Sequence, residues 1–340
     1  MPRTTLPSLL LATPYLAAAN NGNWRTAARW ARLLAPTYRV ILQAADAPVT
    51  GGRRDAAVAL VALHARRSRA AVAAWCAARP DRALVVALTG TDLYRDLPAG
   101  DADTAASLAA ADRLVVLQED APAQLPSALR PRADVVFQSA RALRPWPHKA
   151  AGRLHCLLVA HLRTEKDPRT AFAAWRLLPR ELPITLTIVG AALDPELGAA
   201  AAELAAADPR VRWLGPRPHA WTRQAIRRAH LLLVPSRMEG GANVIVEGVT
   251  AATPVVASRV SGNVGMLGGG YAGYFPAGDG PALAAILQRA YGDPSFRALL
   301  QAQCARRAPR FEPAAEREAL EAVVAAARAA AERRAGRMPD

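Results

Sequence analysis

The stretch that decides the fold is LLLVPSRMEGGANVIVEGVTAATPVVAS, residues 231–258. Its first four residues are all apolar, as in a strand that is buried on both faces of a parallel sheet. Pro235 ends this strand, and a helix with apolar residues on one face is expected from about Asn243, with a second strand at residues 255–257. The sequence therefore predicts a strand–loop–helix–strand unit, which is the building block of an α/β fold.

The loop of this unit has the residues of a phosphate-binding loop. Gly240 and Gly241 let backbone N–H groups approach a ligand closely, and the following helix N-terminus carries a partial positive charge. Two carboxylates flank the loop, Glu239 before it and Glu247 on the helix. For the glycines alone, a plain tight turn is an equally good interpretation. The added glutamates favour a site that binds phosphate together with hydroxyl groups.

The whole pattern, EGGANVIVEGVTAATPVVAS, resembles the retaining glycosyltransferases of family 4 type, whose usual form is E-G-F/x-G-x-x-x-x-E followed by A-x-G-x-P-V-V-A-S. The resemblance implies the GT-B fold, an α/β fold with two Rossmann-like domains and a deep interdomain cleft. It also implies a C-terminal helix that crosses back to the N-terminal domain. The expected bounds are residues 1–145 for the acceptor-side domain, 146–311 for the nucleotide-sugar-binding domain and 312–335 for the helix.

The resemblance extends to the donor side of the second domain. Lys166 in AHLRTEKD is similar to the lysine of the family's G-R-L-x-x-E-K-G motif, which contacts the donor diphosphate. A solvated surface lysine is the alternative. His161 stands where the family has arginine, and Asp167 replaces the final glycine. Arg163 is a second candidate for the missing cation, and the sequence does not decide between it and His161.

The two glutamates take different roles in this interpretation. Glu247 is expected on the ribose hydroxyls, because a carboxylate can accept two hydrogen bonds from a diol. Glu239 is expected at the sugar hydroxyls near the reacting carbon, where it would also stabilise developing positive charge. The other donor-side residues that the resemblance implies are Gly240, Gly241, Ala242, Asn243, Val244 and Arg217.

The N-terminal half predicts a similar domain. A strand at residues 8–12, a glycine-containing loop and a helix at residues 24–34 open the chain. Residues 56–78 are expected to form one helix or two. A strand at residues 84–88 ends in the polar run TGTDLYRD, and the carboxyl ends of parallel strands line the ligand crevice. The acceptor-side candidates are Gly22, Asn23, Arg25 and Arg95.

One position departs from the resembled family. Many of its members carry a histidine where this chain has Thr89. A hydroxyl acceptor benefits from a base, whereas an ionised acceptor such as a thiolate, thiophosphate or selenophosphate does not. Asp92 is the alternative base. The catalytic candidates are therefore Glu239, Asp92 and Thr89.

Three short segments narrow the resemblance. ALTGTDLYRD, the QSA after the expected fifth strand, and HLRTEKDP look like the selenosugar synthases (SenB) of selenoneine biosynthesis. These enzymes form a carbon–selenium bond between a UDP-sugar and selenophosphate, and the donated group would be a hexosyl or N-acetylhexosaminyl group. No metal and no cofactor besides the UDP-sugar is implied. Two alternatives remain, a family 4 enzyme with a lipid, glycan or small-alcohol acceptor, and a non-catalytic nucleotide-sugar-binding protein.

The composition is compatible with this interpretation. A chain of 340 residues usually contains two domains, and its net charge of +15 favours anionic ligands. Nucleic acid is not expected as a partner, because the basic residues are scattered without interleaved aromatic residues. Cys76, Cys156 and Cys304 lie far apart and are expected to be reduced thiols in a cytoplasmic protein.

Two further segments, residues 3–19 and 261–265, have more than one possible structure. Residues 3–19 mimic a signal peptide, but two prolines interrupt the run and it continues into a Rossmann-like unit, so it is interpreted as the first strand. No stretch is long and apolar enough for stable membrane insertion. Residues 261–265, SGNVG, are expected to form a second glycine loop. The protein is expected to be a monomer or a homodimer.

Overall fold

The fold is described from a computed structural model, which covers residues 6–16 and 22–336. Asn20 and Asn21 of the predicted N-terminal loop lie outside the described residues. The chain forms two compact units, one made of Met1–Gln138 with Pro313–Asp340 and the other of Ser139–Glu312. The first unit ends at Gln138, whereas the sequence placed the boundary at residue 145.

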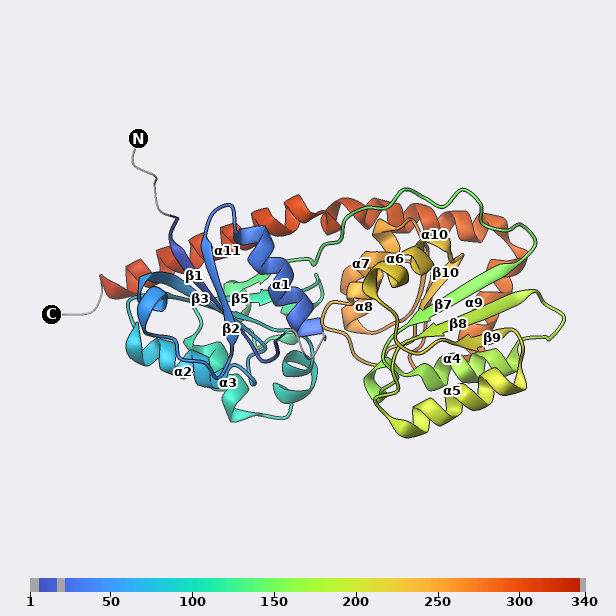
Figure 1. The fold of residues 1–340 in the computed structure, drawn as a ribbon, viewed down its shortest axis with the longest axis horizontal. Helices are drawn as coiled ribbons and strands as arrows, with labels where there is room; N and C mark the ends of the chain where they lie inside the picture. Colours follow the sequence, from blue (N-terminus) through green and yellow to red (C-terminus); the bar gives the residue numbers. More distant parts are fainter. Residues whose placement is uncertain (1–5, 17–21, 337–340) are drawn as a thin grey trace. The chain divides into compact units, whose positions relative to one another are not determined.

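The first unit is built on a six-stranded sheet in the order β2-β1-β3-β4-β5-β6, in which every pair of neighbours is parallel (Figure 1). Its strands are β1 (Ser8–Thr13), β2 (Arg39–Ala44), β3 (Ala57–Leu63), β4 (Ala83–Ala87), β5 (Arg113–Val116) and β6 (Ala133–Val135). Its α-helices are α1 (Gly22–Leu34), α2 (Arg69–Ala78), α3 (Ala102–Ala110) and α11 (Pro313–Ala335).

The strands of this sheet are buried on both faces. Leu9, Leu11 and Val61 pack in one hydrophobic cluster with residues of α1 and α11. Leu10 and Leu60 pack in a second cluster, with residues of α2 and α3. Because successive side chains of a strand point to opposite faces, the continuous apolar runs of the sequence supply both clusters.

The second unit repeats the architecture with the strand order β12-β11-β10-β7-β8-β9, again parallel throughout. Its strands are β7 (Leu154–Val159), β8 (Ile184–Val189), β9 (Val211–Trp213), β10 (Leu231–Val234), β11 (Val255–Ser258) and β12 (Tyr274–Phe275). Its α-helices are α4 (Pro168–Leu177), α5 (Pro195–Ala207), α6 (His219–Arg228), α7 (Asn243–Thr250), α8 (Ser261–Leu267), α9 (Gly280–Gly292) and α10 (Pro294–Arg307).

Two sequence predictions about local structure are wrong. Residues 56–78 are not purely helical, because β3 occupies the first part and only α2 is an α-helix. Residues 261–265 are not a glycine loop but the start of α8. The predicted fold class of two Rossmann-like parallel sheets is confirmed.

Helix α11 returns to the first unit, as predicted. It packs on α1 and β4, and Glu316 anchors it. The carboxylate of Glu316 is buried and accepts hydrogen bonds from the indole N–H of Trp30 at 2.7 Å and from Nε of Arg29 at 2.9 Å. Further along, the hydroxyl of Thr37 donates to Glu321 at 2.6 Å. No helix in the described ranges is long and apolar enough to cross a membrane.

Glu316→Ala is expected to lower the free energy of unfolding by about 2–4 kcal/mol, because it leaves a partly buried guanidinium and a buried indole N–H without their acceptor. Denaturant unfolding measures the change. Glu318→Ala is the matched control, since Glu318 is exposed on the same helix. Equal stability of the two variants would contradict the anchoring role of Glu316.

Candidate active site

The loops after β7 and β10 meet because these strands are parallel neighbours in the sheet. Nζ of Lys166, after β7, donates to both carboxylate oxygens of Glu239, after β10, at 2.7 and 2.8 Å. The hydroxyl of Ser236 donates to the same carboxylate at 2.6 Å. The Glu239 side chain is only 7% exposed and that of Lys166 is 21% exposed. Two residues that the sequence assigned to the donor side therefore form one partly buried ion pair.

A second ion pair ties the same two loops together. Nε of Arg237 donates to the carboxylate of Asp167 at 3.0 Å. The backbone N–H of Arg237 donates to the carbonyl of Glu165 at 2.9 Å. Asp167 itself has a left-handed backbone (φ 43°), a conformation in which glycine is more common. The family's glycine position is thus filled by an aspartate whose side chain holds the neighbouring loop.

Helix α8 packs directly against the backbone of Glu239. A Cβ atom at Gly262 would lie 1.9 Å from the carbonyl oxygen of Glu239, so only glycine fits there. The hydroxyl of Ser258 donates to the carbonyl of Ser236, and the amide of Asn263 donates to the carbonyl of Ser258 at 3.0 Å. These contacts fix the backbone that carries the Lys166–Glu239 pair.

The glycine loop leads into α7 without a side-chain cap. The N-cap residue is Ala242, and no side chain caps the helix in the described part of the chain. Alanine is a poor N-cap, so the first-turn N–H groups near Asn243 and Val244 keep the partial positive charge of an uncapped helix end. Such an end suits a phosphate group, as the sequence predicted for Gly240 and Gly241.

Glu247 is held by α6. Nε2 of His219 lies 2.7 Å from Oε1 of Glu247, whose side chain is 14% exposed. One turn further along α6, Arg223 donates to the backbone carbonyl of Glu247 at 2.5 Å and to the hydroxyl of Thr250 at 3.2 Å. Burial lowers the pKa of the Arg223 guanidinium, and the Glu247 carboxylate opposes this shift. Helix α6 therefore contacts both the side chain of Glu247, through His219, and its backbone, through Arg223.

The remaining donor-side candidates lie on the loops around these two clusters. Nδ1 of His161 accepts the N–H of Ala191 at 3.2 Å, which places the proton of a neutral ring on Nε2. Arg163 lies 3.8 Å from the carboxylate of Glu165. The guanidinium of Arg217 lies over the ring of Trp221, 5.9 Å from its centroid. Which of His161 and Arg163 takes the place of the family's arginine stays a prediction.

In the first unit, Asp92 is a buried anchor. Its carboxylate accepts N–H groups from Thr89 at 2.9 Å, from Gly90 at 2.8 Å and from Leu93 at 3.1 Å. It also accepts the N–H of Ala65, after β3, at 3.0 Å. The side chain has no exposed surface, and its oxygens face backbone amides, with Nδ1 of His64 3.7 Å from Oδ2. The role of Asp92 as a base stays a prediction, and this geometry gives the carboxylate a holding role.

The other acceptor-side candidates fall into two places. Gly22, Asn23 and Arg25 lie in the first turn of α1. Nε of Arg95 donates to the carboxylate of Asp96 at 2.9 Å, so this cation is already paired. Thr89 is half-buried in the loop after β4.

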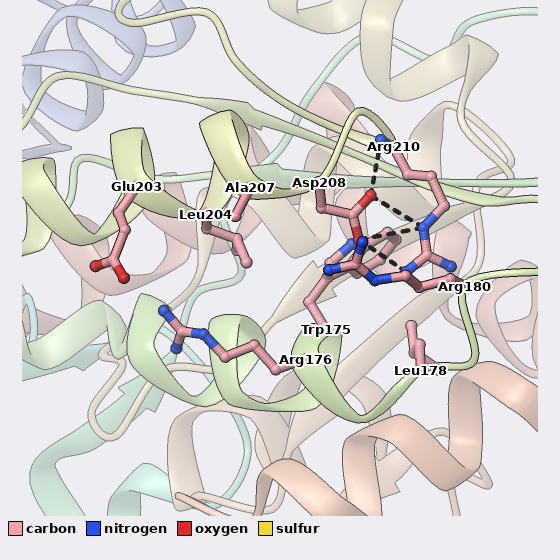
Figure 2. A pocket seen from close by; sticks show the side chains of 9 residues that line it. All are labelled: Trp175, Arg176, Leu178, Arg180, Glu203, Leu204, Ala207, Asp208 and Arg210. Carbon is pink, nitrogen blue, oxygen red and sulfur yellow. Dashed lines mark hydrogen bonds and ion pairs between the residues drawn. The ribbon is translucent and has the colours of Figure 1, made fainter.

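A pocket of about 290 Å³ lies elsewhere in the second unit, where α4 and α5 end (Figure 2). Trp175 and Leu204 line it, together with Asp208, which forms an ion pair with Arg210 at 2.8 Å. None of the predicted site residues lines this pocket.

Sequence reasoning missed three residues that support the site. Ser236 is the hydroxyl donor to Glu239, His219 is the partner of Glu247, and Gly262 permits the close approach of α8. The spacing of Ser236, three residues before Glu239, is a local signal for the first. The other two depend on contacts between distant segments, which no local pattern reports.

Comparisons with known proteins bear on the family and the fold. Residues 153–293 match the family described as glycosyl transferases group 1. No curated protein sequence matches the chain. In fold, the chain is similar to Anabaena HepE in complex with UDP and glucose, with a TM-score of 0.74 and 16% identity over 94% of this chain and 99% of that one.

Two other solved structures show the same likeness. Sucrose-phosphate synthase from Thermosynechococcus elongatus has a TM-score of 0.72 and 17% identity over 93% of this chain and 98% of its own. The lipopolysaccharide outer core galactosyltransferase WaaB, in its apo form, has a TM-score of 0.68 and 14% identity over 93% and 98%. Residues 153–293 thus match the model of the group 1 glycosyl transferases, and the chain as a whole has the GT-B fold.

Proposed function

We propose that this protein is a glycosyltransferase that takes its sugar from a UDP-sugar. The observation that carries the proposal is the Lys166–Glu239 pair beside the uncapped N-terminus of α7, within the segment that matches the family. The complexes of HepE with UDP and with UDP-glucose support a uridine donor. Glu247 would accept hydrogen bonds from the ribose hydroxyls, because the contact with His219 uses one of its two oxygens.

The chemistry follows from this placement. Lys166 has three N–H donors, and two of them are used by Glu239, so the third would reach the donor diphosphate. The first-turn amides of α7 would bind the distal phosphate. As the bond between the anomeric carbon and the diphosphate oxygen breaks, these donors would stabilise the negative charge of the leaving UDP, and Glu239 would stabilise positive charge on the sugar.

For the acceptor, we propose selenophosphate, with a bond forming between selenium and the anomeric carbon while the bond to UDP breaks. The phosphoryl group stays on selenium until water hydrolyses the selenium–phosphorus bond and releases phosphate. This proposal rests on the sequence segments quoted above and on Thr89, which offers no base for a hydroxyl acceptor. The comparisons favour the broader alternative, transfer to a lipid, glycan or small alcohol. The matching family is described only as glycosyl transferases group 1, and none of the three solved structures named above carries a description that mentions selenium.

Substitutions on the donor side test the proposal. Lys166→Ala is expected to lower kcat/KM for the UDP-sugar about 100-fold, because a charge that stabilises the leaving diphosphate is lost.

Glu247→Gln is expected to raise the Kd for UDP about tenfold, because a neutral amide is a weaker acceptor for the ribose hydroxyls. Isothermal titration with UDP and steady-state release of UDP measure the two effects.

Glu196→Gln serves as the control for these variants, because its side chain is 84% exposed on α5 and pairs with the exposed Arg169. UDP affinity that is unchanged in Glu247→Gln would contradict the assignment of the ribose site. A protein that binds UDP, releases none from UDP-sugars and is indifferent to loss of Glu239 would be a non-catalytic binding protein.

The acceptor is tested by product mass. Incubation with UDP-N-acetylglucosamine or UDP-glucose and selenophosphate is expected to yield UDP and a selenosugar, with little product from neutral alcohols. The product is detected by mass spectrometry through the isotope pattern of selenium. Turnover of an alcohol without turnover of selenophosphate would support the hydroxyl-acceptor alternative and overturn the selenium assignment.

A further inference from the structure

Three loops with polar side chains meet at the carboxyl edge of the first sheet. Strands β1, β3 and β4 are neighbours there, and the loops that follow them carry Tyr15, Arg67 and Thr91 respectively. In parallel α/β sheets, ligands bind at this edge. Thr91 belongs to the polar run TGTDLYRD that the sequence analysis singled out, whereas Tyr15 and Arg67 were not assigned to the site from the sequence.

The loops after β3 and β4 are fixed to each other by one carboxylate. Asp92 accepts the N–H of Ala65 from the first loop and those of Thr89 and Gly90 from the second. The carboxylate also accepts the N–H of Leu93. If either loop moved away, the buried carboxylate of Asp92 would lose hydrogen bonds that water cannot replace. The side chains on these loops are therefore held in place before any ligand arrives.

A buried histidine orients the hydroxyl of Thr91. Nδ1 of His64 accepts the N–H of Arg67 at 3.4 Å and lies 3.7 Å from Oδ2 of Asp92, and the hydrogen bond from Arg67 favours the tautomer with the proton on Nε2. Nε2 lies 3.0 Å from Oγ1 of Thr91 and donates to it. His64 is only 2% exposed and cannot serve a ligand directly. The hydrogen of the half-buried Thr91 hydroxyl is then left to donate to a ligand.

The same loop holds an oriented guanidinium. Arg67 lies over the ring of Tyr15, 5.1 Å from its centroid, and NH1 donates to the Tyr15 hydroxyl. Its neighbours are already neutralised, since Arg66 pairs with Asp101 at 3.2 Å and Arg95 pairs with Asp96. Within the described ranges, Arg67 has no carboxylate partner.

We propose that Arg67 and Thr91, positioned by Tyr15 and His64, bind a phosphate-type oxyanion carried by the acceptor. This inference rests on the proposed transferase function and names the class of its acceptor. Both groups act as hydrogen-bond donors to the ligand, and one carries a full positive charge, so the pair selects an anion over a neutral alcohol. Asp92 does not oppose the anion at close range, because its charge is buried and compensated by amides.

The test measures anion binding to the full chain by isothermal titration, with saturating UDP present to fill the donor phosphate site. The probes are inorganic phosphate, monothiophosphate and glucose 6-phosphate, with neutral glucose as the comparison. The variants are Arg67→Ala, Arg67→Lys, Thr91→Val and Thr91→Ser. Arg53→Ala is the matched control, because Arg53 is an exposed arginine that precedes β3 and so lies at the opposite edge of the sheet.

The wild type is expected to bind one equivalent of an anion and no glucose. Arg67→Ala and Thr91→Val are expected to weaken anion binding about tenfold, with partial retention in Arg67→Lys and Thr91→Ser. Tighter binding of the inorganic anions than of glucose 6-phosphate identifies a free oxyanion as the acceptor, and the reverse identifies a phosphomonoester. Arg53→Ala is expected to bind as the wild type does.

Two results would overturn the inference. One is the absence of anion binding by the UDP-saturated wild type, and the other is unchanged affinity in Arg67→Ala. Failure of the donor proposal is distinguishable, because it shows as the absence of UDP binding in a separate titration. Valine has nearly the same shape as threonine but lacks the hydroxyl, whereas serine keeps the hydroxyl. Anion affinity that is retained in Thr91→Ser and lost in Thr91→Val therefore indicates a hydrogen-bonding role for Thr91 and not a packing role.

Discussion

The site in the second unit depends on the ion pair between Lys166 and Glu239. Parallel pairing of β7 and β10 brings their carboxyl ends together, and the pair joins the two loops at that point. Partial burial makes the pair costly to break, because removal of one partner leaves the other charge without compensation. The hydroxyl of Ser236 adds a third donor to the Glu239 carboxylate. The groups assigned to the donor thus hold each other in place without a ligand.

A buried carboxylate lies at the carboxyl edge of each sheet, Glu239 in the second unit and Asp92 in the first, and the two are satisfied in different ways. Glu239 is bound by the ammonium of Lys166 and the hydroxyl of Ser236. Asp92 is bound by backbone N–H groups, including those of Ala65 and Gly90. Hydrogen bonds from amides fix the backbone of a loop, so Asp92 is suited to hold the loops.

The sequence predicted the fold wherever a local pattern has one physical cause. The apolar run before Pro235 is a strand, and the helix from Asn243 begins where expected. Residues 56–78 were mispredicted because an alanine-rich strand buried on both faces lacks the alternation that separates strand from helix. The prediction of a loop at residues 261–265 treated Gly262 as a turn signal. Its real cause is the close approach to Glu239, which only the folded chain reveals.

In the part of the chain that the structure describes, helix α7 begins without a side-chain cap, as α2, α4, α6 and α8 also do, whereas four other helices begin with an aspartate cap. Asp101, Asp194, Asp279 and Asp293 each accept a first-turn N–H at the start of α3, α5, α9 and α10. At α7, the N-cap is Ala242, which forgoes roughly 1 kcal/mol of helix stability relative to such an aspartate. An aspartate there would repel an anionic ligand and occupy the amides that the ligand needs. A phosphate bound at this end would take the place of the missing cap, so the local instability of α7 and its capacity to bind phosphate have the same cause.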